Sequence, residues 1–286
     1  MTLLITAITP MIWGTTYIVT TESLPPDRPL LAAVLRALPA GILLVAATRR
    51  LPTGSWWWRS TVLGTLNIGA FFALLFVAAY RLPGGVAATV GAIQPIAVAL
   101  LAFVVLGTRL STRTVLVALA GIFGVGLLVL RAEARLDGWG VAAALGGAIV
   151  MACGVVLSKK WTSDAPLLAV TGWQLTAGGL VLLPFAAMAE GAPPAMTLEN
   201  VAGYVYLATI GSALAYALWF RGIRALSPTS VTFLGLLSPV VATVIGWVVL
   251  GQDLSLLQQL GAVIVLLAIV IAQLPRRQAV APVVRP

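Results

Sequence analysis

Ten nearly continuous runs of apolar residues, each about 20 residues long, occupy most of this 286-residue chain. A helix of about that length crosses the hydrocarbon core of a bilayer. A membrane barrel would instead show shorter segments of alternating polarity. The pattern therefore predicts an all-α integral membrane protein with ten transmembrane helices. The expected spans are Leu3–Thr20, Pro29–Thr48, Ser60–Tyr80, Gly84–Leu106, Arg113–Leu130, Gly138–Leu157, Pro166–Met188, Val201–Phe220, Pro228–Leu250 and Leu256–Leu274.

The composition excludes the soluble classes of protein. Hydrophobic residues make up 60% of the chain and charged residues only 9%, against about 25% charged in an ordinary soluble domain. The net charge of +9 is explained by the orientation of a membrane protein rather than by a nucleic-acid partner. We therefore expect the lipid bilayer as the surroundings, no nucleic-acid partner, and a retained first helix rather than a cleaved signal.

The basic residues predict the orientation, because Lys and Arg concentrate in cytoplasmic loops. If the N-terminus is cytoplasmic, twelve of the Lys and Arg residues fall on the cytoplasmic side of the membrane and four on the opposite side. The inside set is Arg49, Arg50, Arg59, Arg109, Arg113, Lys159, Lys160, Arg221, Arg224, Arg276, Arg277 and Arg285, and the outside set is Arg28, Arg81, Arg131 and Arg135. We expect both termini to be cytoplasmic, in the inner membrane of a bacterium.

The two halves of the chain repeat one another. The segment Val104–Gly107 is identical to Val248–Gly251, 144 residues later, and Pro95 meets Pro239 at the same shift. Each half holds five helices, an odd number, so equivalent helices cross the bilayer in opposite directions. Such inverted repeats are typical of secondary transporters with a substrate site near the midplane. The expected division is a first repeat at 1–130, a loop at 131–137, a second repeat at 138–274 and a cytoplasmic tail at 275–286.

Several motifs resemble the EamA-type ten-helix permeases of the drug/metabolite transporter superfamily, and among them the bacterial aromatic amino-acid exporters. They are Trp13-Gly14, Arg36, the block from Gln94-Pro95 to Ser111, and the block from Ser238-Pro239 to Gly261. The resemblance implies a cavity lined by the first, third and fourth helices of each half and open alternately to either side. Many relatives carry Glu where this chain has Gln94, Ser238, Thr108 and Gln252, so the resemblance does not imply carboxylate-dependent coupling here.

Two prolines near the middle of their spans are the candidate hinges. A proline removes one backbone hydrogen bond and crowds the carbonyl four residues earlier, and those positions hold small residues. Matched kinks in opposed repeats would expose carbonyls to a shared cavity, which we favour over a kink that serves packing alone. The candidate hinge residues are Gly91, Pro95, Gly235 and Pro239.

Polar and aromatic side chains within the spans are the candidate substrate contacts. Amides can bind both charged ends of a zwitterion, although an interhelical hydrogen bond explains each amide equally well. A stripe from Thr9 to Thr20 and another from Thr209 to Trp219 offer hydroxyls and rings, and helix–helix contacts explain any single member of them better. The candidates are Trp13, Thr16, Asn67, Gln94, Ser212, Tyr216, Trp219 and Ser238.

Ionisable groups are scarce inside the predicted spans. Arg36 is the basic residue clearly inside a span. Its expected partners are backbone carbonyls, hydroxyls or a substrate carboxylate, and we favour a structural role. The chain has no histidine, and its eight acidic residues fall in loops or at span ends. Proton and sodium coupling usually need such groups within the membrane. We therefore expect facilitated movement or exchange, and neither a cofactor, a metal site nor an enzymatic activity.

The sequence predicts a secondary transporter that exports small amphipathic metabolites, chiefly amino acids including aromatic ones, by alternating access. A sugar-phosphate or nucleotide-sugar exchanger is an alternative, but phosphate recognition calls for several cavity Lys or Arg. A channel or a non-transporting scaffold is an alternative of another class. The physiological substrate, the direction of net flux and the oligomeric state do not follow from the sequence.

Overall fold

The computed structural model describes residues 1–81, 84–129, 137–251 and 253–274, and the elements within these ranges are helical. The first half holds α1 (Thr2–Ser23), α2 (Pro29–Thr48), α3 (Trp56–Gly64), the π turn η1 (Thr65–Gly69), α4 (Ala70–Arg81), α5 (Gly84–Gly91), α6 (Gln94–Leu106) and α7 (Thr112–Val129). The second half holds α8 (Gly138–Lys160), α9 (Leu167–Glu190), α10 (Leu198–Ala208), the π turn η2 (Thr209–Leu214), α11 (Ala215–Ala225), α12 (Pro228–Gly235), α13 (Leu237–Val248) and α14 (Leu256–Gln273).

The predicted spans appear in the structure as helices. Nine helical segments within the described ranges are long and apolar enough to cross a membrane. The remaining prediction, Ser60–Tyr80, corresponds to α3, η1 and α4, which follow one another without a break from Trp56 to Arg81. The predicted connecting loop and C-terminal tail lie almost wholly outside the described residues.

The inverted repeat predicted from the sequence governs where the helices begin and end. A shift of 144 residues places α5 on α12 and α7 on α14, with the same first and last residues, and it places the start of η1 on the start of η2. Gly107 directly follows α6 and has φ 67°, and its counterpart Gly251, which lies three residues after the end of α13, has φ 64°. A left-handed glycine is a common way to end a helix, so the duplicated sequence places the same turn residue after both helices.

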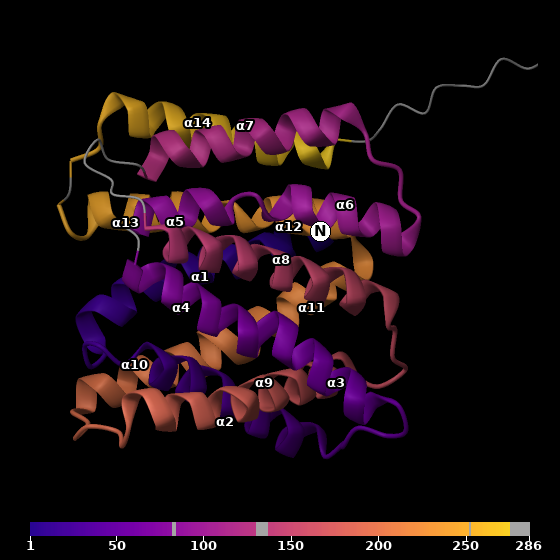
Figure 1. The fold of residues 1–286 in the computed structure, drawn as a ribbon, viewed down its shortest axis with the longest axis vertical. Helices are drawn as coiled ribbons and strands as arrows, with labels where there is room; N and C mark the ends of the chain where they lie inside the picture. The colour runs from indigo at the N-terminus through magenta and orange to yellow at the C-terminus, as the bar shows by residue number, and fades with distance from the viewer. Residues whose placement is uncertain (82–83, 130–136, 252, 275–286) are drawn as a thin grey trace, which may run out of the picture.

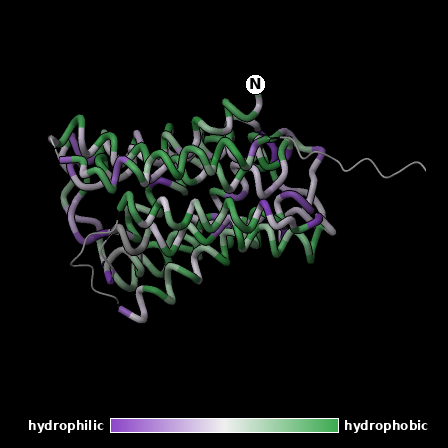
Figure 2. The backbone as a smooth tube through the Cα atoms, turned by 90° about the horizontal axis from the view of Figure 1, so that it is seen from above, coloured by the Kyte–Doolittle hydropathy of each residue, from purple (hydrophilic) through white to green (hydrophobic). Residues whose placement is uncertain are grey.

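Two helix pairs form the opposite ends of the molecule (Figure 1). Helix α2 packs along α9 at one end, and α7 packs along α14 at the other. The remaining helices lie between these pairs. In Figure 2 hydrophobic residues predominate along the helices, and hydrophilic residues gather toward their two ends. This distribution is the one expected of helices that cross a membrane.

Glycines allow each end pair to pack backbone against backbone. A Cβ atom added at Gly41 would lie 2.3 Å from the backbone nitrogen of Thr176 in α9. A Cβ atom added at Gly261 would lie 2.5 Å from the backbone nitrogen of Leu128 in α7. Small residues of this kind let membrane helices approach closely and gain van der Waals contact. The end pairs therefore depend on having no side chain at these positions.

Candidate functional site

The two π turns lie in the third membrane helix of each half, between α3 and α4 and between α10 and α11. A π turn widens the backbone locally, and such turns are frequent at functional sites. In η2 the carbonyl oxygen of Gly211 accepts hydrogen bonds from two other helices, from Trp13 Nε1 at 3.2 Å and from Arg36 Nη2 at 3.1 Å. Just after η2, the Ala215 carbonyl accepts a hydrogen bond from Thr9 Oγ1 at 3.0 Å. The widened segment thus joins α1, α2 and α11 around one point.

An aromatic cluster adjoins η2 and contains three of the predicted site residues. The ring of Trp13 lies 5.2 Å from that of Tyr216 and 5.1 Å from that of Trp219, measured between centroids. Tyr216 and Trp219 are buried, while Trp13 is half-buried. The edge of the Trp219 ring faces Gly235, whose added Cβ would lie 3.9 Å from it. The cluster therefore connects α1 and α11 with the break in the ninth span.

Two polar side-chain atoms of α1 and α11, Thr16 Oγ1 and Trp219 Nε1, are buried and have no hydrogen-bond partner among the described residues. Leaving a buried donor unpaired costs about 1–3 kcal/mol, so each of these groups calls for an explanation. Both atoms belong to residues predicted to contact substrate.

Asn67 lies in η1 and is fully buried. Its Nδ2 donates to Ser158 Oγ at 3.1 Å and to Gln174 Oε1 at 3.0 Å, and its backbone carbonyl accepts from the Tyr216 hydroxyl at 3.5 Å. Its Oδ1 faces α8, where a Cβ added at Gly154 would lie 2.2 Å away. In this conformation Asn67 links helices α8, α9 and α11.

Arg36 is buried and has the kinds of partner expected from its lone position in a span. Its Nε donates to Ser212 Oγ at 3.3 Å, and its guanidinium lies 4.8 Å from the centre of the Phe72 ring. Together with the bond to Gly211, these contacts fasten α2 to η2. Ser212, another predicted site residue, is thus an acceptor for this arginine.

The fourth and ninth spans are each interrupted next to a predicted hinge. Helix α5 ends at Gly91 and α6 begins at Gln94, while α12 ends at Gly235 and α13 begins at Leu237. The junction residues have nearly the same backbone angles, φ −68° and ψ −16° at Ile93 and φ −66° and ψ −10° at Leu236. A Cβ added at Gly91 would meet no atom within 4 Å.

The remaining two predicted site residues lie beside these breaks and are half-buried. The backbone carbonyl of Ser238 lies 2.9 Å from a Cβ added at Gly14, the residue after Trp13, so α1 packs closely on this part of α13. The hydrogen bonds and ring contacts described above do not include Gln94 at the start of α6. The structure thus brings together Trp13, Asn67, Ser212, Tyr216 and Trp219, and it places Thr16 and Ser238 on adjoining segments.

Packing of the broken helices differs between the two ends of the membrane spans. Helix α12 packs against α6. The repeat relates this contact to one between α5 and α13, and the described helices show no comparable packing there. Helix α5 packs against α7 and α8, and α12 makes the related contacts with α14 and α1. Among the described residues, the fourth and ninth spans therefore pack against each other toward one end.

Two members of the polar network, Ser158 and Gln174, are not predicted from the sequence. Gln174 could have been found, because it is an amide inside the predicted span Pro166–Met188 and such a group needs a partner there. Ser158 lies near the end of its span and resembles an ordinary interfacial residue. The role of the Gly211 carbonyl as an acceptor cannot be predicted from the sequence, because it depends on the backbone conformation of η2.

The sequence and the fold were compared with known proteins. Residues 1–130 and 138–273 match the EamA-like transporter family. The chain is 49% identical over 266 residues to "Protein PecM" of Dickeya dadantii, with 92% of this chain and 89% of that protein covered. It is 27% identical over 277 residues to a "Probable amino-acid metabolite efflux pump" of Salmonella typhimurium, with 90% and 89% covered. A crystal structure with 20% sequence identity superposes with a TM-score of 0.81 over 95% of this chain and 96% of the other, which shows the same fold.

Proposed function

Because this chain belongs to the EamA-like transporter family, we propose that it is a secondary transporter that exports small amphipathic metabolites by alternating access. The observation that carries this proposal is the unequal packing of the broken helices. Helix α12 meets α6, while the related pair, α5 and α13, is not packed in this way among the described residues. If the two repeats exchange conformations, the packed end opens and the other closes, which is the cycle expected of inverted repeats.

Amino acids, aromatic ones included, are the proposed substrates. The cluster of Trp13, Tyr216 and Trp219 offers ring faces for an amphipathic side chain. The unpartnered Trp219 Nε1 and Thr16 Oγ1 can donate to a carboxylate. A similar protein bears the name of a probable amino-acid metabolite efflux pump, which supports export. Arg36 already donates hydrogen bonds to Ser212 and Gly211. Because recognition of a phosphorylated substrate calls for several Lys or Arg in the cavity, this arrangement favours amino acids.

Transport is proposed to be facilitated rather than coupled to an ion gradient. The chain has no histidine, and its eight acidic residues fall in loops or at span ends. Acidic or imidazole groups within the membrane are the usual carriers of proton coupling and the usual ligands of a coupling cation. The mechanism then needs only a substrate gradient or a second substrate moving in the opposite direction.

We expect counterflow of labelled phenylalanine into proteoliposomes preloaded with unlabelled phenylalanine, and we expect it to persist after a protonophore is added in sodium-free buffer. A panel of amino acids as competitors measures specificity, and liposomes without protein give the background. Competition by other aromatic amino acids and no competition by sugar phosphates is the expected pattern. Collapse of counterflow with the protonophore, while the substrate gradient is kept, would show that a coupling site exists. Flux that fails to saturate would indicate a channel.

The proposed location is the inner membrane of a bacterium, with both termini in the cytoplasm. We expect a green fluorescent protein fused after Pro286 to fluoresce and alkaline phosphatase at the same position to stay inactive, because the former folds only inside and the latter only outside. The reason is the partition of basic residues to one side of the ten spans. An active phosphatase with a dark fluorescent fusion would refute either the orientation or the number of spans.

A further inference from the structure

Three tryptophans surround the guanidinium group of Arg59 at one end of the bundle. Trp56, Trp58 and Arg59 lie in the first turn of α3, and Trp161 directly follows α8. The guanidinium carbon lies 6.0 Å from the centre of the Trp56 ring, 5.6 Å from that of Trp58 and 5.7 Å from that of Trp161. We call these three rings the tryptophan cage. Because α3 belongs to the first half of the chain and α8 to the second, the cage joins the two halves.

Further contacts hold the rings of the tryptophan cage in place. The rings of Trp58 and Trp161 meet edge to face, with their centroids 5.0 Å apart. The ring of Trp56 lies 6.0 Å from that of Trp173 in α9, whose Nε1 donates to the Arg50 carbonyl at 2.8 Å. A cation beside the faces of aromatic rings is attracted to them. The cage therefore fixes the guanidinium in position without using its hydrogen-bond donors.

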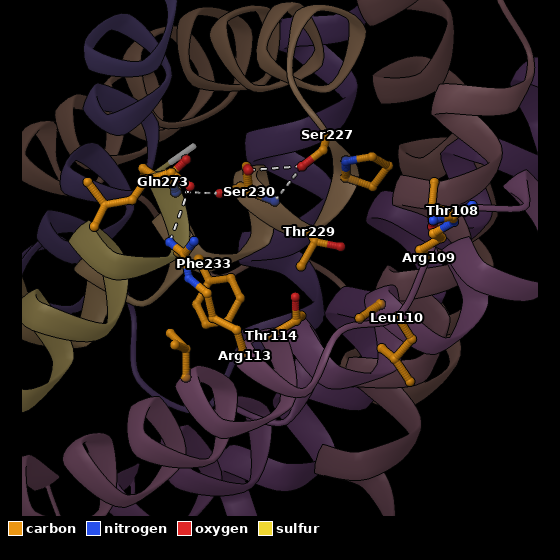
Figure 3. Close-up of a pocket in the computed structure, with 15 residues that line it drawn as sticks. Thr108, Arg109, Leu110, Arg113, Thr114, Ser227, Thr229, Ser230, Phe233 and Gln273 are labelled. Carbon is orange, nitrogen blue, oxygen red and sulfur yellow. Dashed lines mark hydrogen bonds between the residues drawn. The ribbon is translucent and has the colours of Figure 1, made fainter. Parts of the chain in front are cut away.

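The Nε donor of Arg59 is buried and has no hydrogen-bond partner among the described residues. Two other arginines make such bonds. Arg36 donates to the Gly211 carbonyl. Arg113 lines a cavity of about 330 Å³ beside the starts of α7 and α12, and it donates to backbone carbonyls at the end of α14 (Figure 3). A buried donor without a partner is costly, and Arg59 as a whole is half-buried, so an acceptor from outside the chain can reach its guanidinium.

The position of the tryptophan cage along the chain indicates where this acceptor comes from. The cage residues flank the ends of two predicted spans, Ser60–Tyr80 and Gly138–Leu157, and Trp gathers at the level of the lipid headgroups. Arg50 and Lys160, which are exposed, lie next to the cage or to its neighbour in α9. Asp164 is the acidic residue expected on this side, and it forms no ion pair with the described residues. The surroundings of the cage therefore favour an anion at the membrane surface.

The repeat shows that the fold does not need this chemistry. The shift of 144 residues that matches the starts of η1 and η2 relates Arg59 in α3 to Gly203 in α10. A Cβ added at Gly203 would lie 2.9 Å from Leu24 Cδ2, and Leu24 follows α1 as Trp161 follows α8. Both junctions are present, since α10 packs against α1 and α3 packs against α8. One junction is built from a glycine and a leucine, so packing does not explain the arginine and the cage at the other.

We propose that Arg59 and the tryptophan cage bind the phosphate group of an anionic phospholipid. Guanidinium N–H groups form strong, often bidentate, hydrogen bonds with phosphate oxygens. Indole rings lie at the headgroup level, and basic residues beside them attract anionic lipids. The bound lipid would contact the start of α3 and the end of α8 together and so link the two halves. The inference goes beyond the transported substrate and does not depend on its identity.

The first test titrates short-chain phosphatidylglycerol into the purified full-length protein in an uncharged detergent and measures thermal unfolding. We expect a saturable rise in the melting temperature. Arg59→Gln should raise the half-saturating lipid concentration by about tenfold, because it removes a charge-assisted hydrogen bond. Arg59→Lys keeps the charge but not the planar fork of donors, so it should weaken binding less. The matched control is Arg221→Gln, which removes an exposed arginine outside the cage and should keep the wild-type response.

Further arms test the cage and the class of ligand. Trp161→Leu removes one ring and should also raise the half-saturating concentration. Phosphatidylcholine, or inorganic phosphate at equal ionic strength, should stabilise the protein less than phosphatidylglycerol does. The proposal is overturned if either of them stabilises the protein equally well, or if phosphatidylglycerol gives no saturable effect. It is also overturned if Arg221→Gln weakens the response as much as Arg59→Gln does, or if Arg59→Gln or Trp161→Leu keeps the full response. No substrate enters these measurements, so their failure leaves the transport proposal untouched.

Discussion

Gly41→Ala is expected to lower the yield of folded, monodisperse protein by about tenfold or more. The added Cβ would lie 2.3 Å from the backbone nitrogen of Thr176 and 2.9 Å from the backbone carbon of Leu175. Backbone atoms inside a packed helix cannot swing aside as a side chain does, so α2 and α9 must separate along their shared face. Overpacking of this kind costs about 1–3 kcal/mol or more. That is a large part of the total stability of a typical domain.

The matched control is Gly146→Ala in α8. There the nearest atom to the added Cβ is a methyl of Leu74 at 3.5 Å, an ordinary contact. Because alanine favours helix by about 1 kcal/mol over glycine, this variant should fold at least as well as wild type. The measurements are size-exclusion profile and thermal unfolding in detergent. Equal behaviour of the two variants would refute the close approach of α2 and α9.

Pro95→Ala and Pro239→Ala are each expected to slow counterflow by about tenfold per folded molecule. Alanine restores a backbone donor that can bond the carbonyl four residues earlier, at Gly91 or Gly235, and so favours a continuous helix across the break. The proposed cycle needs the two segments of each span to move separately. Straightening one span should therefore bias the protein toward one conformation.

Labelling of reporter cysteines distinguishes this hinge role from a packing role. The background replaces the lone Cys153 by serine, and single cysteines are then placed near either end of the aromatic cluster. The two proline variants should shift labelling in opposite senses, because the repeats are inverted. A packing kink would instead lower stability and leave the rate per folded molecule unchanged. Normal rates with unshifted labelling in both variants would remove the hinge proposal.

The features that the sequence predicted correctly depend on local information. Apolar runs locate the spans because hydropathy is a property of each segment taken alone. The glycine Gly107 ends α6, and its counterpart Gly251 adopts the same left-handed backbone after α13, because this conformation depends on residue type. The duplicated blocks identify the two repeats, and the inverted topology follows because each repeat holds five helices, an odd number.

The features that the sequence did not predict depend on contacts between distant segments. Nothing in the residues of η1 or η2 distinguishes a π turn from ordinary helix. The partners of Asn67 lie 91 and 107 residues away along the chain, so its amide could be recognised as needing a partner without the partner being known. The unequal packing of α6 with α12 cannot be predicted from repeats whose sequences are alike.

The end pairs of the molecule have a practical consequence. The repeat relates α2 to α9 and α7 to α14, so exchanging the conformations of the two repeats leaves each of these pairs made of the same two helices. The same exchange replaces the contact between α6 and α12 by a contact between α5 and α13. In the proposed cycle, these four outer helices can therefore keep their contacts while the six spans between them rearrange. A protein of 29.7 kDa is small for single-particle imaging and needs added mass. A rigid fusion or antibody fragment that bridges the neighbouring ends of α7 and α14 would supply that mass while leaving the protein free to adopt each of its states.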